Sequence, residues 1–415
     1  MQDLAKPEAV PALAELLDEV CERFHQQGAL GLVAVDAEPL GEIEKRYGHE
    51  AHRTALGVLG ELVQAACREA LGCAELIAAG ETARSELLVL TARPADDADF
   101  YRVKLPELVL AIRQRLERQG HRAVYPWMRQ PPLLPLGSAY VVRNPLVSPV
   151  RQIRGALDEA RADAQLASAL ARRALRREFM ELLVAGDVQS VFEPVVDSSA
   201  LTVFGYEALV RGPEGTPYES PAVLFRRGIE ENLIFELDCL CRRKAIEGAR
   251  DFPEGAKLFL NIRPTSIHDP NFQPDTLRRT LGRCGLSPAD VVFEISEQES
   301  IENYQVFREA RDAYGRLGFQ FALDDTGVGY ASLEALMELA PEFIKVDRAF
   351  VAGIDQDPAR QNMVRAFQAI ASHSGARIIG EGLDRIEELQ MLAHLGIPFG
   401  QGWLFGKASP LRGKG

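Results

Sequence analysis

Short apolar segments in the C-terminal half of the chain end in polar side chains that could bind metal ions. The segment FQFALDD, residues 319–325, ends in two adjacent carboxylates, Asp324 and Asp325. Two carboxylates at one strand tip repel each other unless a cation lies between them, and hard divalent cations prefer such oxygen ligands. Taken alone, an Asp-Asp pair is explained more simply as a strand end closed by an Asx turn. The remaining segments therefore decide between a turn and a metal site.

Other apolar segments carry polar residues at comparable positions. They supply Glu207, Asn261, Glu294, Lys345 with Asp347, Glu381 and Gln401. In a parallel barrel the carboxyl ends of the strands meet at one mouth, so these side chains are expected to converge there. Mutual repulsion of so many acids must be offset by cations, most simply two divalent ions. Oxygen ligands without His or Cys favour Mg²⁺ or Mn²⁺, and two such ions suit in-line attack on a phosphodiester.

The elements that would position these residues recur in a regular order along the chain. Eight β-type segments are separated by helical patterns, which predicts an α/β fold with a (β/α)8 TIM-like barrel and mostly parallel strands. The first two segments follow each other too closely for a helix between them, so they should pair as a hairpin and make one strand antiparallel. The strands are expected at 188–196, 202–210, 257–262, 291–296, 319–325, 343–347, 377–382 and 398–405, and the helices at 221–230, 234–250, 273–284, 302–316, 331–339, 358–373 and 385–395.

The N-terminal part predicts a second α/β domain, because helical patterns alternate with buried apolar segments. We expect helices at 8–27, through Leu56–Val63 and at 103–118, and strands at GALGLVAVD, AELIAAG, SELLVLTA and SAYVVR. Residues 151–183 are rich in Ala, Leu, Arg and Glu, a composition that favours helix. The predicted boundaries are 1–150 for the first domain, 151–174 for a linker helix and 175–411 for the barrel. That helix could transmit a signal, pack a dimer or simply connect the domains.

Composition excludes several classes of protein. The formal net charge of −13 argues against a long nucleic acid as partner. No apolar segment approaches the roughly 18 residues of a membrane-spanning helix, and the N-terminus lacks a signal-peptide pattern, so we expect a cytoplasmic protein. The cysteines are scattered and form no CxxC pair, which disfavours a disulfide framework or a structural zinc site.

The order and spacing of these segments resemble the EAL family of cyclic di-GMP phosphodiesterases over about residues 175–410. YEALVRG contains the name motif, and the other family motifs resemble LFLNI, FEISE, DDTGVGYASL, IKVD, GEGLD and QGWLFGKASP in this chain. The resemblance implies hydrolysis of cyclic di-GMP to linear pGpG with two Mg²⁺ or Mn²⁺ ions. It implies metal ligation by Glu207, Asn261, Glu294, Asp324, Asp325 and Glu381, catalytic roles for Lys345, Glu381, Asp325 and Gln401, and substrate contacts from Arg211 and Glu207.

The N-terminal layout resembles a GGDEF domain whose motif has degenerated. The signature turn reads Ala83-Arg84-Ser85-Glu86-Leu87, so the glycines that admit a nucleotide phosphate are absent. Asp36 and Glu86 remain. The resemblance implies a regulatory domain that is not a cyclase, and an unrelated α/β sensor domain stays open as the alternative.

Some residues depart from the family pattern and leave the function open to alternatives. Glu193 stands where the family has Gln, Thr326 and Val328 replace Phe and Thr in the loop after Asp325, and Asp384 replaces Glu. No metal ligand or lysine is lost, so the sequence favours an enzyme. A catalytically weak cyclic di-GMP receptor that acts through a protein partner is the alternative, and a phosphodiesterase for another small nucleotide is a third. We also expect a homodimer.

Overall fold

The structure is a computed structural model, and the chain forms two compact units, Met1–Arg176 and Arg177–Gly415. It describes residues 9–80, 85–129, 131–250, 252–263, 265, 269–296, 304–326 and 340–411, without the side chains of 271, 304–307, 325 and 326. Within these ranges no helix has both the length and the apolar character needed to cross a membrane.

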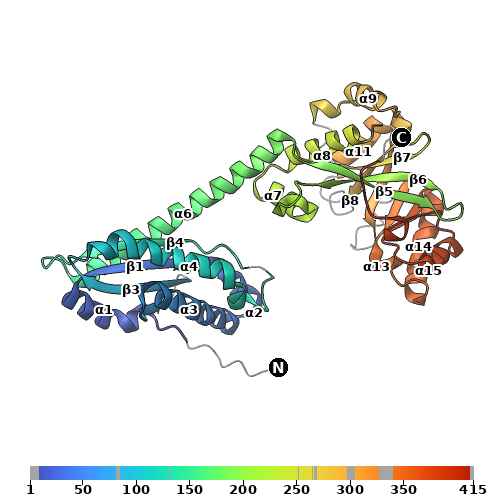
Figure 1. Ribbon diagram of the computed structural model, residues 1–415. Coiled ribbons are helices and arrows are strands. Elements are labelled where there is room, and N and C mark those ends of the chain that lie inside the picture. Colours follow the sequence, from blue (N-terminus) through green and yellow to red (C-terminus); the bar gives the residue numbers. More distant parts are fainter. Residues whose placement is uncertain are drawn as a thin grey trace. The chain divides into compact units, whose positions relative to one another are not determined.

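Unit 1 is built on a four-stranded sheet with the order β2-β3-β1-β4. Each strand pairs antiparallel to its neighbour. Figure 1 labels its principal elements, and helices occur before, between and after the strands along the chain. The bounds are α1 Leu13–Gln27, β1 Gly28–Asp36, α2 Gly41–Tyr47, α3 His49–Leu71, β2 Leu76–Ala79, β3 Glu86–Pro94, α4 Leu105–Gln119, α5 His121–Val124, β4 Leu136–Val142 and α6 Pro149–Ala185.

Both faces of this sheet are covered, which explains the unbroken apolar sequence of β1. Val33 and Val35 pack with Leu59 of α3 and Leu108 of α4. Leu30 and Leu32, which point to the other face, pack with Phe24 of α1 and Ile153 of α6. Successive side chains of a strand alternate between faces, so a strand buried on both sides must be apolar at every position.

Helix α6 is anchored to unit 1 by close packing and by an ion pair. A Cβ on Gly137 of β4 would lie 2.1 Å from the carbonyl oxygen of Ala160, so only glycine fits where the helix crosses the strand. The backbone N–H of Ser138 donates to Asp163. The guanidinium of Arg161 donates from Nε to Oε2 of Glu86 at 3.0 Å and from Nη2 to Oε1 at 2.5 Å. This forked pair joins the middle of α6 to the start of β3.

Two helices of unit 1 differ in extent from the sequence-based expectation. The helix predicted at 8–27 begins at Leu13, because Ala12 forms a β-bridge with Ala79. The helix predicted as a linker over 151–174 lies inside α6, which spans 37 residues and ends before Gly186 at a φ of +67°. The α/β character of unit 1 is confirmed, whereas its GGDEF-like type stays a prediction.

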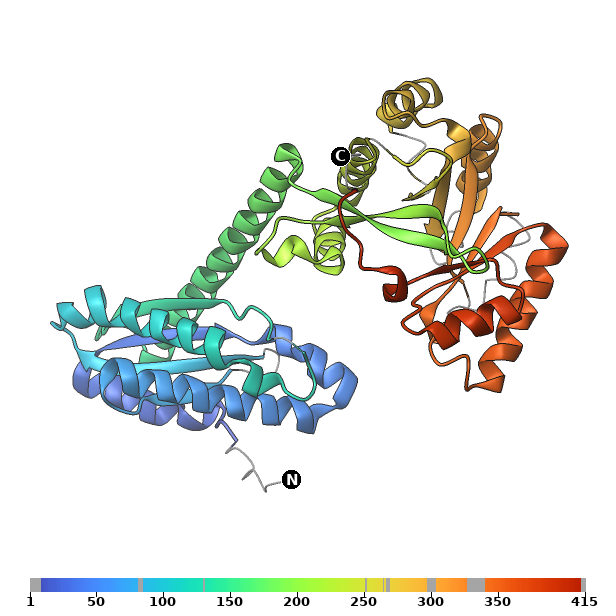
Figure 2. The same cartoon turned by 45° about the vertical axis from the view of Figure 1, so that its right-hand side comes forward.

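Unit 2 is a closed eight-stranded barrel with the strand order β10-β11-β12-β5-β6-β7-β8-β9. β5 runs antiparallel to both of its neighbours, β6 and β12. The hairpin of β5 and β6, green in Figure 2, confirms the expected antiparallel strand. The strand bounds are β5 Gln189–Asp197, β6 Val203–Arg211, β7 Lys257–Asn261, β8 Val291–Ser296, β9 Gln320–Thr326, β10 Phe343–Val346, β11 Arg377–Gly380 and β12 Phe399–Gln401.

Helices follow the strands largely where the sequence placed them. The expected helix at 331–339 lies outside the described residues. The helices are α7 Pro221–Glu230, α8 Ile234–Gly248, α9 Pro274–Arg283, α11 Tyr304–Gly315, α13 Arg348–Val351, α14 Pro358–Ser374 and α15 Ile386–His394.

The barrel interior holds an apolar layer near the amino ends of the parallel strands. It consists of Val195, Phe259, Val292, Ala322, Phe343, Ile379 and Phe399, with Phe204 packed against it. The guanidinium of Arg377 lies over the rings of this layer, 4.3 Å from the centroid of Phe343. Because strand side chains repeat their direction every second residue, the residue two positions further along each parallel strand must point into the same barrel.

We predict that Glu86→Gln destabilises unit 1 by about 2–3 kcal/mol, because it leaves the largely buried guanidinium of Arg161 without its carboxylate. Asp158→Asn is the matched control: this carboxylate also pairs with Arg161, but its side chain is 76% exposed, so a loss below about 0.5 kcal/mol is expected. Urea unfolding followed by circular dichroism measures both variants. Equal losses would show that the Arg161–Glu86 pair does not hold α6.

Candidate active site at the mouth of the barrel

The ammonium of Lys345 on β10 lies at the centre of a cluster of carboxylates. Its Nζ atom is 2.8 Å from Glu381 Oε1, 2.9 Å from Glu294 Oε1, 3.0 Å from Glu207 Oε2 and 3.4 Å from Asp324 Oδ1. These acids come from different strands or strand ends, β6, β8, β9 and β11. The side chains predicted from the sequence to converge are therefore brought together.

This cluster is a second layer stacked on the apolar one. Lys345 follows Phe343 by two residues, Asn261 follows Phe259, and Glu294 follows Val292. Asp324, Glu381 and Gln401 stand in the same relation to Ala322, Ile379 and Phe399. On the antiparallel strand β5 the polar residue, Glu193, instead precedes its apolar partner Val195.

Burial gives these charges strong effects on one another. Burial would lower the pKa of Lys345, whose side chain is 1% exposed, but the surrounding carboxylates raise that pKa well above its usual value. Burial raises the pKa of Glu294 well above normal, aided by the charge of Glu207. Burial also raises the pKa of Glu381 to about 8, although the charge of Lys345 acts to lower that pKa. The site therefore contains more carboxylates than the single ammonium of Lys345 can neutralise.

Two amide side chains connect the acids to one another. Asn261 Nδ2 donates to Glu207 Oε1 at 3.0 Å and to Glu294 Oε2 at 3.3 Å. Gln401 Nε2 donates to Glu207 Oε2 at 2.6 Å and to Glu193 Oε2 at 3.3 Å. Burial would raise the pKa of Glu207, but the charge of Lys345 and the hydrogen bond from Gln401 lower it. Both amides turn their N–H groups to carboxylates, so their carbonyl oxygens face elsewhere.

The chemistry of this donor set fits divalent cations. The buried oxygens Glu294 Oε1, Asp324 Oδ1 and Gln401 Oε1 receive no hydrogen bond, although the first two lie within ion-pair distance of Lys345. Oxygen atoms of this kind are the preferred ligands of Mg²⁺ and Mn²⁺. Among the described residues no three His, Cys, Asp or Glu side chains are already spaced as a metal site, because the ammonium holds the central position.

Some expected site residues lie apart from this cluster or outside the description. Arg211 lines a separate hollow of about 250 Å³ with Asn261 and Arg263, and its Nη1 donates to the carbonyl of Val210. Asp347 caps α13 by accepting from the N–H of Ala349, and it also lines the hollow that opens on Glu207 and Glu381. The side chains of Asp325 and Thr326 are not described, and Val328 lies outside the described residues.

A second hollow of about 250 Å³ opens on the carboxylates and contains residues that the sequence reasoning missed. Arg348 and Trp403 line it together with Glu207, Glu381 and Gln401. Arg348 directly follows the identified motif IKVD, and Trp403 lies within the identified motif QGWLFGKASP, so proximity in sequence was the available signal. The charge of Arg348 is engaged by Asp384 at 2.5 Å.

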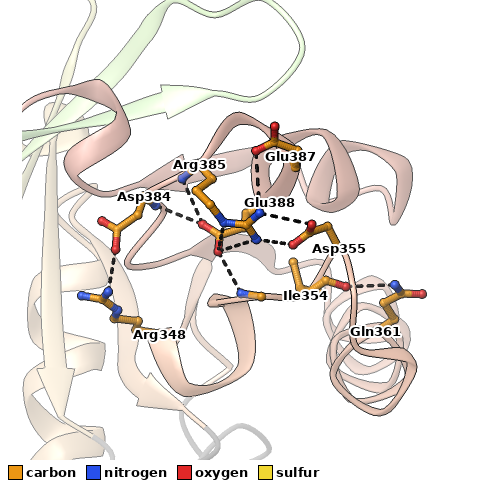
Figure 3. A network of polar contacts seen from close by, with 9 residues as sticks. Arg348, Ile354, Asp355, Gln361, Asp384, Arg385, Glu387 and Glu388 are labelled. Atoms are coloured by element: carbon orange, nitrogen blue, oxygen red, sulfur yellow. Dashed lines mark hydrogen bonds and ion pairs between the residues drawn. The ribbon is translucent and has the colours of Figure 1, made fainter.

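A buried glutamate holds the loop that carries Glu381. Glu388 of α15 accepts hydrogen bonds from the backbone N–H groups of Gly353, Asp384 and Arg385 and from the guanidinium of Arg385, as Figure 3 shows. Arg385 also pairs with Asp355. In the same loop Gly382 has a φ of +69°, and a Cβ there would lie 2.4 Å from Cγ of Arg348. The network therefore fixes the position of the β11 end relative to the loop after β10.

The fold and the site therefore identify this chain as an α/β-barrel protein with a cluster of carboxylates and one lysine at the mouth of the barrel. Residues 172–408, more than half of the chain, match the EAL domain family. The chain therefore belongs to the EAL domain family.

Relatives and a solved structure agree with this assignment. "Probable cyclic di-GMP phosphodiesterase PdeN" of Escherichia coli K12 is 27% identical over 57% of this chain and 46% of its own length. Cyclic di-GMP phosphodiesterase PdeR of the same organism is 37% identical over 39% and 24%. This chain thus spans less than half of the length of each of these two relatives. The Xanthomonas citri FimX EAL domain, solved with c-diGMP, superimposes with a TM-score of 0.52 at 21% identity over 58% of this chain and 97% of that one, which supports the fold.

We predict that Glu388→Gln lowers the stability of the barrel by about 1–3 kcal/mol, because an amide cannot accept all of the hydrogen bonds that the carboxylate receives. Glu387→Gln is the matched control, since that side chain is exposed and lies 3.8 Å from Arg385; its effect should stay below about 0.5 kcal/mol. The free energy of unfolding in urea is the measurement. A Glu388 variant as stable as the control would contradict the positioning role.

We predict that Lys345→Met destabilises the metal-free barrel by roughly 2–4 kcal/mol, because the carboxylates lose their ammonium. Saturating Mn²⁺ should restore more stability to this variant than to the wild type. Lys257→Met, which removes an ammonium that donates to the carbonyl of Ala289, serves as control. Thermal unfolding in EDTA and in Mn²⁺ measures the effect, and equal Mn²⁺ increments in all three proteins would refute it.

Proposed function

We propose that this protein hydrolyses cyclic di-GMP to linear pGpG in a metal-dependent reaction. The observation that carries the proposal is the cluster of Lys345 with carboxylates from several strands at one mouth of an EAL-family barrel. The names of the relatives PdeN and PdeR support the substrate class. Unit 1 is proposed to regulate the barrel and to have no cyclase activity.

Mg²⁺ or Mn²⁺ would supply an activated water and charge stabilisation when bound. Glu207, Asn261, Glu294 and Asp324 are proposed to hold one ion, and Asp324, Asp325 and Glu381 the second. Asn261 would bind through its carbonyl oxygen, because its N–H groups already donate to Glu207 and Glu294.

The chain's own groups would orient the substrate and stabilise developing charge. The Lys345 ammonium lies among the proposed metal ligands, where it can position a water and stabilise negative charge on the phosphate. Gln401 is held by its N–H bonds to Glu207 and Glu193, which leaves its buried Oε1 atom able to accept a hydrogen bond from that water. Arg211, in the hollow beside Asn261, is placed to bind a substrate phosphate.

Incubation of the purified chain with cyclic di-GMP and Mg²⁺ or Mn²⁺ tests the proposal. We expect pGpG to accumulate, EDTA to stop the reaction, and Glu207→Gln to lower the rate by about 100-fold or more. Glu387→Gln, an exposed carboxylate on α15, should leave the rate unchanged. Chromatography of the nucleotides is the readout.

The same samples distinguish the alternatives. Tight binding of cyclic di-GMP by calorimetry without turnover would replace the enzyme with a receptor that acts through a protein partner. Absence of both turnover and binding would refute cyclic di-GMP as the ligand. A homodimer is proposed for either role, and sedimentation of the full chain measures it.

A further inference from the structure

Unit 1 contains a cavity of about 720 Å³ with largely aliphatic walls. Leu40 and Leu59 come from the core, Leu116 from α4, and Leu170 with Ala171 from α6. The volume lies within the range of about 300–1,000 Å³ that small-molecule sites occupy. The function proposed for the barrel gives this cavity no role.

One wall is the segment Pro131–Leu136, which contains three prolines, Pro131, Pro132 and Pro135. Proline has no backbone N–H, so this wall presents few hydrogen-bond donors. A buried water needs two to four polar partners, and walls of Leu, Ala, Val and Pro side chains offer few of them. An apolar molecule fits this chemistry better than water does.

The rim of the cavity exposes apolar side chains and an unengaged cation. Leu133 of the segment Pro131–Leu136 and Leu170 of α6 both line the cavity and are 57% and 60% exposed. Large apolar side chains gathered around a hollow mark binding sites. Arg113 of α4 lies at the same rim and makes no hydrogen bond or ion pair with the described residues. Glu117, one turn further along α4, is the carboxylate of the lining.

We propose that this cavity binds a small hydrophobic molecule with an acyl-type chain, whose head group presents an acceptor to Arg113. The chain lies between the proline wall and α6, in contact with Leu133 and Leu170. A cationic head group is disfavoured, because it would approach the guanidinium of Arg113.

The site lies against a helix that both units share. Ala167, Ser168, Leu170 and Ala171 of α6 line the cavity. Phe179 and Leu182 of the same helix pack with Leu224 and Leu237 of unit 2. An occupant of the cavity therefore contacts a helix that continues into the core of the barrel unit. This makes the site a means by which a hydrophobic signal could act on α6.

Calorimetric titration of the full chain with dodecanoate tests the site. We expect saturable binding of about one molecule per chain and a rise in melting temperature. Ala171→Trp, which fills the cavity, should weaken binding by at least about tenfold. Ala169→Trp adds the same ring to an exposed position of α6 outside the lining and should bind as the wild type does.

Further variants and ligands test the wall of the cavity and the head group separately. Leu133→Asp alters an exposed side chain of the proline-containing wall and should weaken binding even if Ala171→Trp fails to fold. Arg113→Gln should weaken binding of dodecanoate but not of dodecanol, and dodecyltrimethylammonium should bind less tightly than either. No saturable dodecanoate binding, or equal affinity in Ala171→Trp, Leu133→Asp and the wild type, would overturn the proposal. Because binding is read without cyclic di-GMP, failure here leaves the proposed hydrolysis untouched.

Discussion

The architecture of the barrel depends on one electrostatic constraint: several buried carboxylates must share a single ammonium. Lys345 lies within 3.4 Å of an oxygen of each of four acids. Isolated burial of any one of these charges would be costly. The arrangement persists because Asn261 and Gln401 donate to the carboxylates from the sides, and because the apolar layer beneath holds the strands in register. Burial, together with neighbouring carboxylates, raises the pKa values of Glu294 and Glu381, and this unfavourable burial of negative charge is the physical basis of the cation binding proposed for the site.

The second organising feature is that the parallel strands contribute one inward side chain to the apolar layer and the next inward side chain to the polar cluster. A ring of Phe, Val, Ile and Ala side chains fills the interior, and the next inward positions carry the polar groups. A one-residue slip in any strand would place its polar residue on the outer face and an outward residue in the cluster. In the loops the backbone is not held by hydrogen bonds between strands. There the hydrogen bonds that Glu388 accepts from backbone N–H groups fix the position of the chain.

Much of this could be predicted from the sequence because the alternation of two residues is local. The strand segments and the convergence of the site residues follow from that alternation and from barrel closure, and the antiparallel strand follows from the short spacing between the first two segments. The converging residues are Glu207, Asn261, Glu294, Asp324, Lys345, Glu381 and Gln401. The place of Glu193 needed the opposite direction of β5. The ion pair of Arg161 with Glu86, separated by 75 positions, has no periodic signal. The late start of α1 depends on a bridge to Ala79, which a helical pattern at 8–27 cannot reveal. The α/β layout of unit 1 follows from its alternating helical and apolar patterns, whereas its GGDEF-like type stays a prediction.

The aromatic layer under the cluster also determines how molecules can reach the site. Phe259, Phe343 and Phe399, with Arg377 stacked over Phe343, occupy the amino-terminal end of the barrel, so the interior is packed side chain and not a pore. Among the described residues, the amino-terminal end is therefore closed by packed side chains, and the carboxylates lie at the other end. In the hydrolysis proposed above, the product would leave by the same end at which the substrate enters.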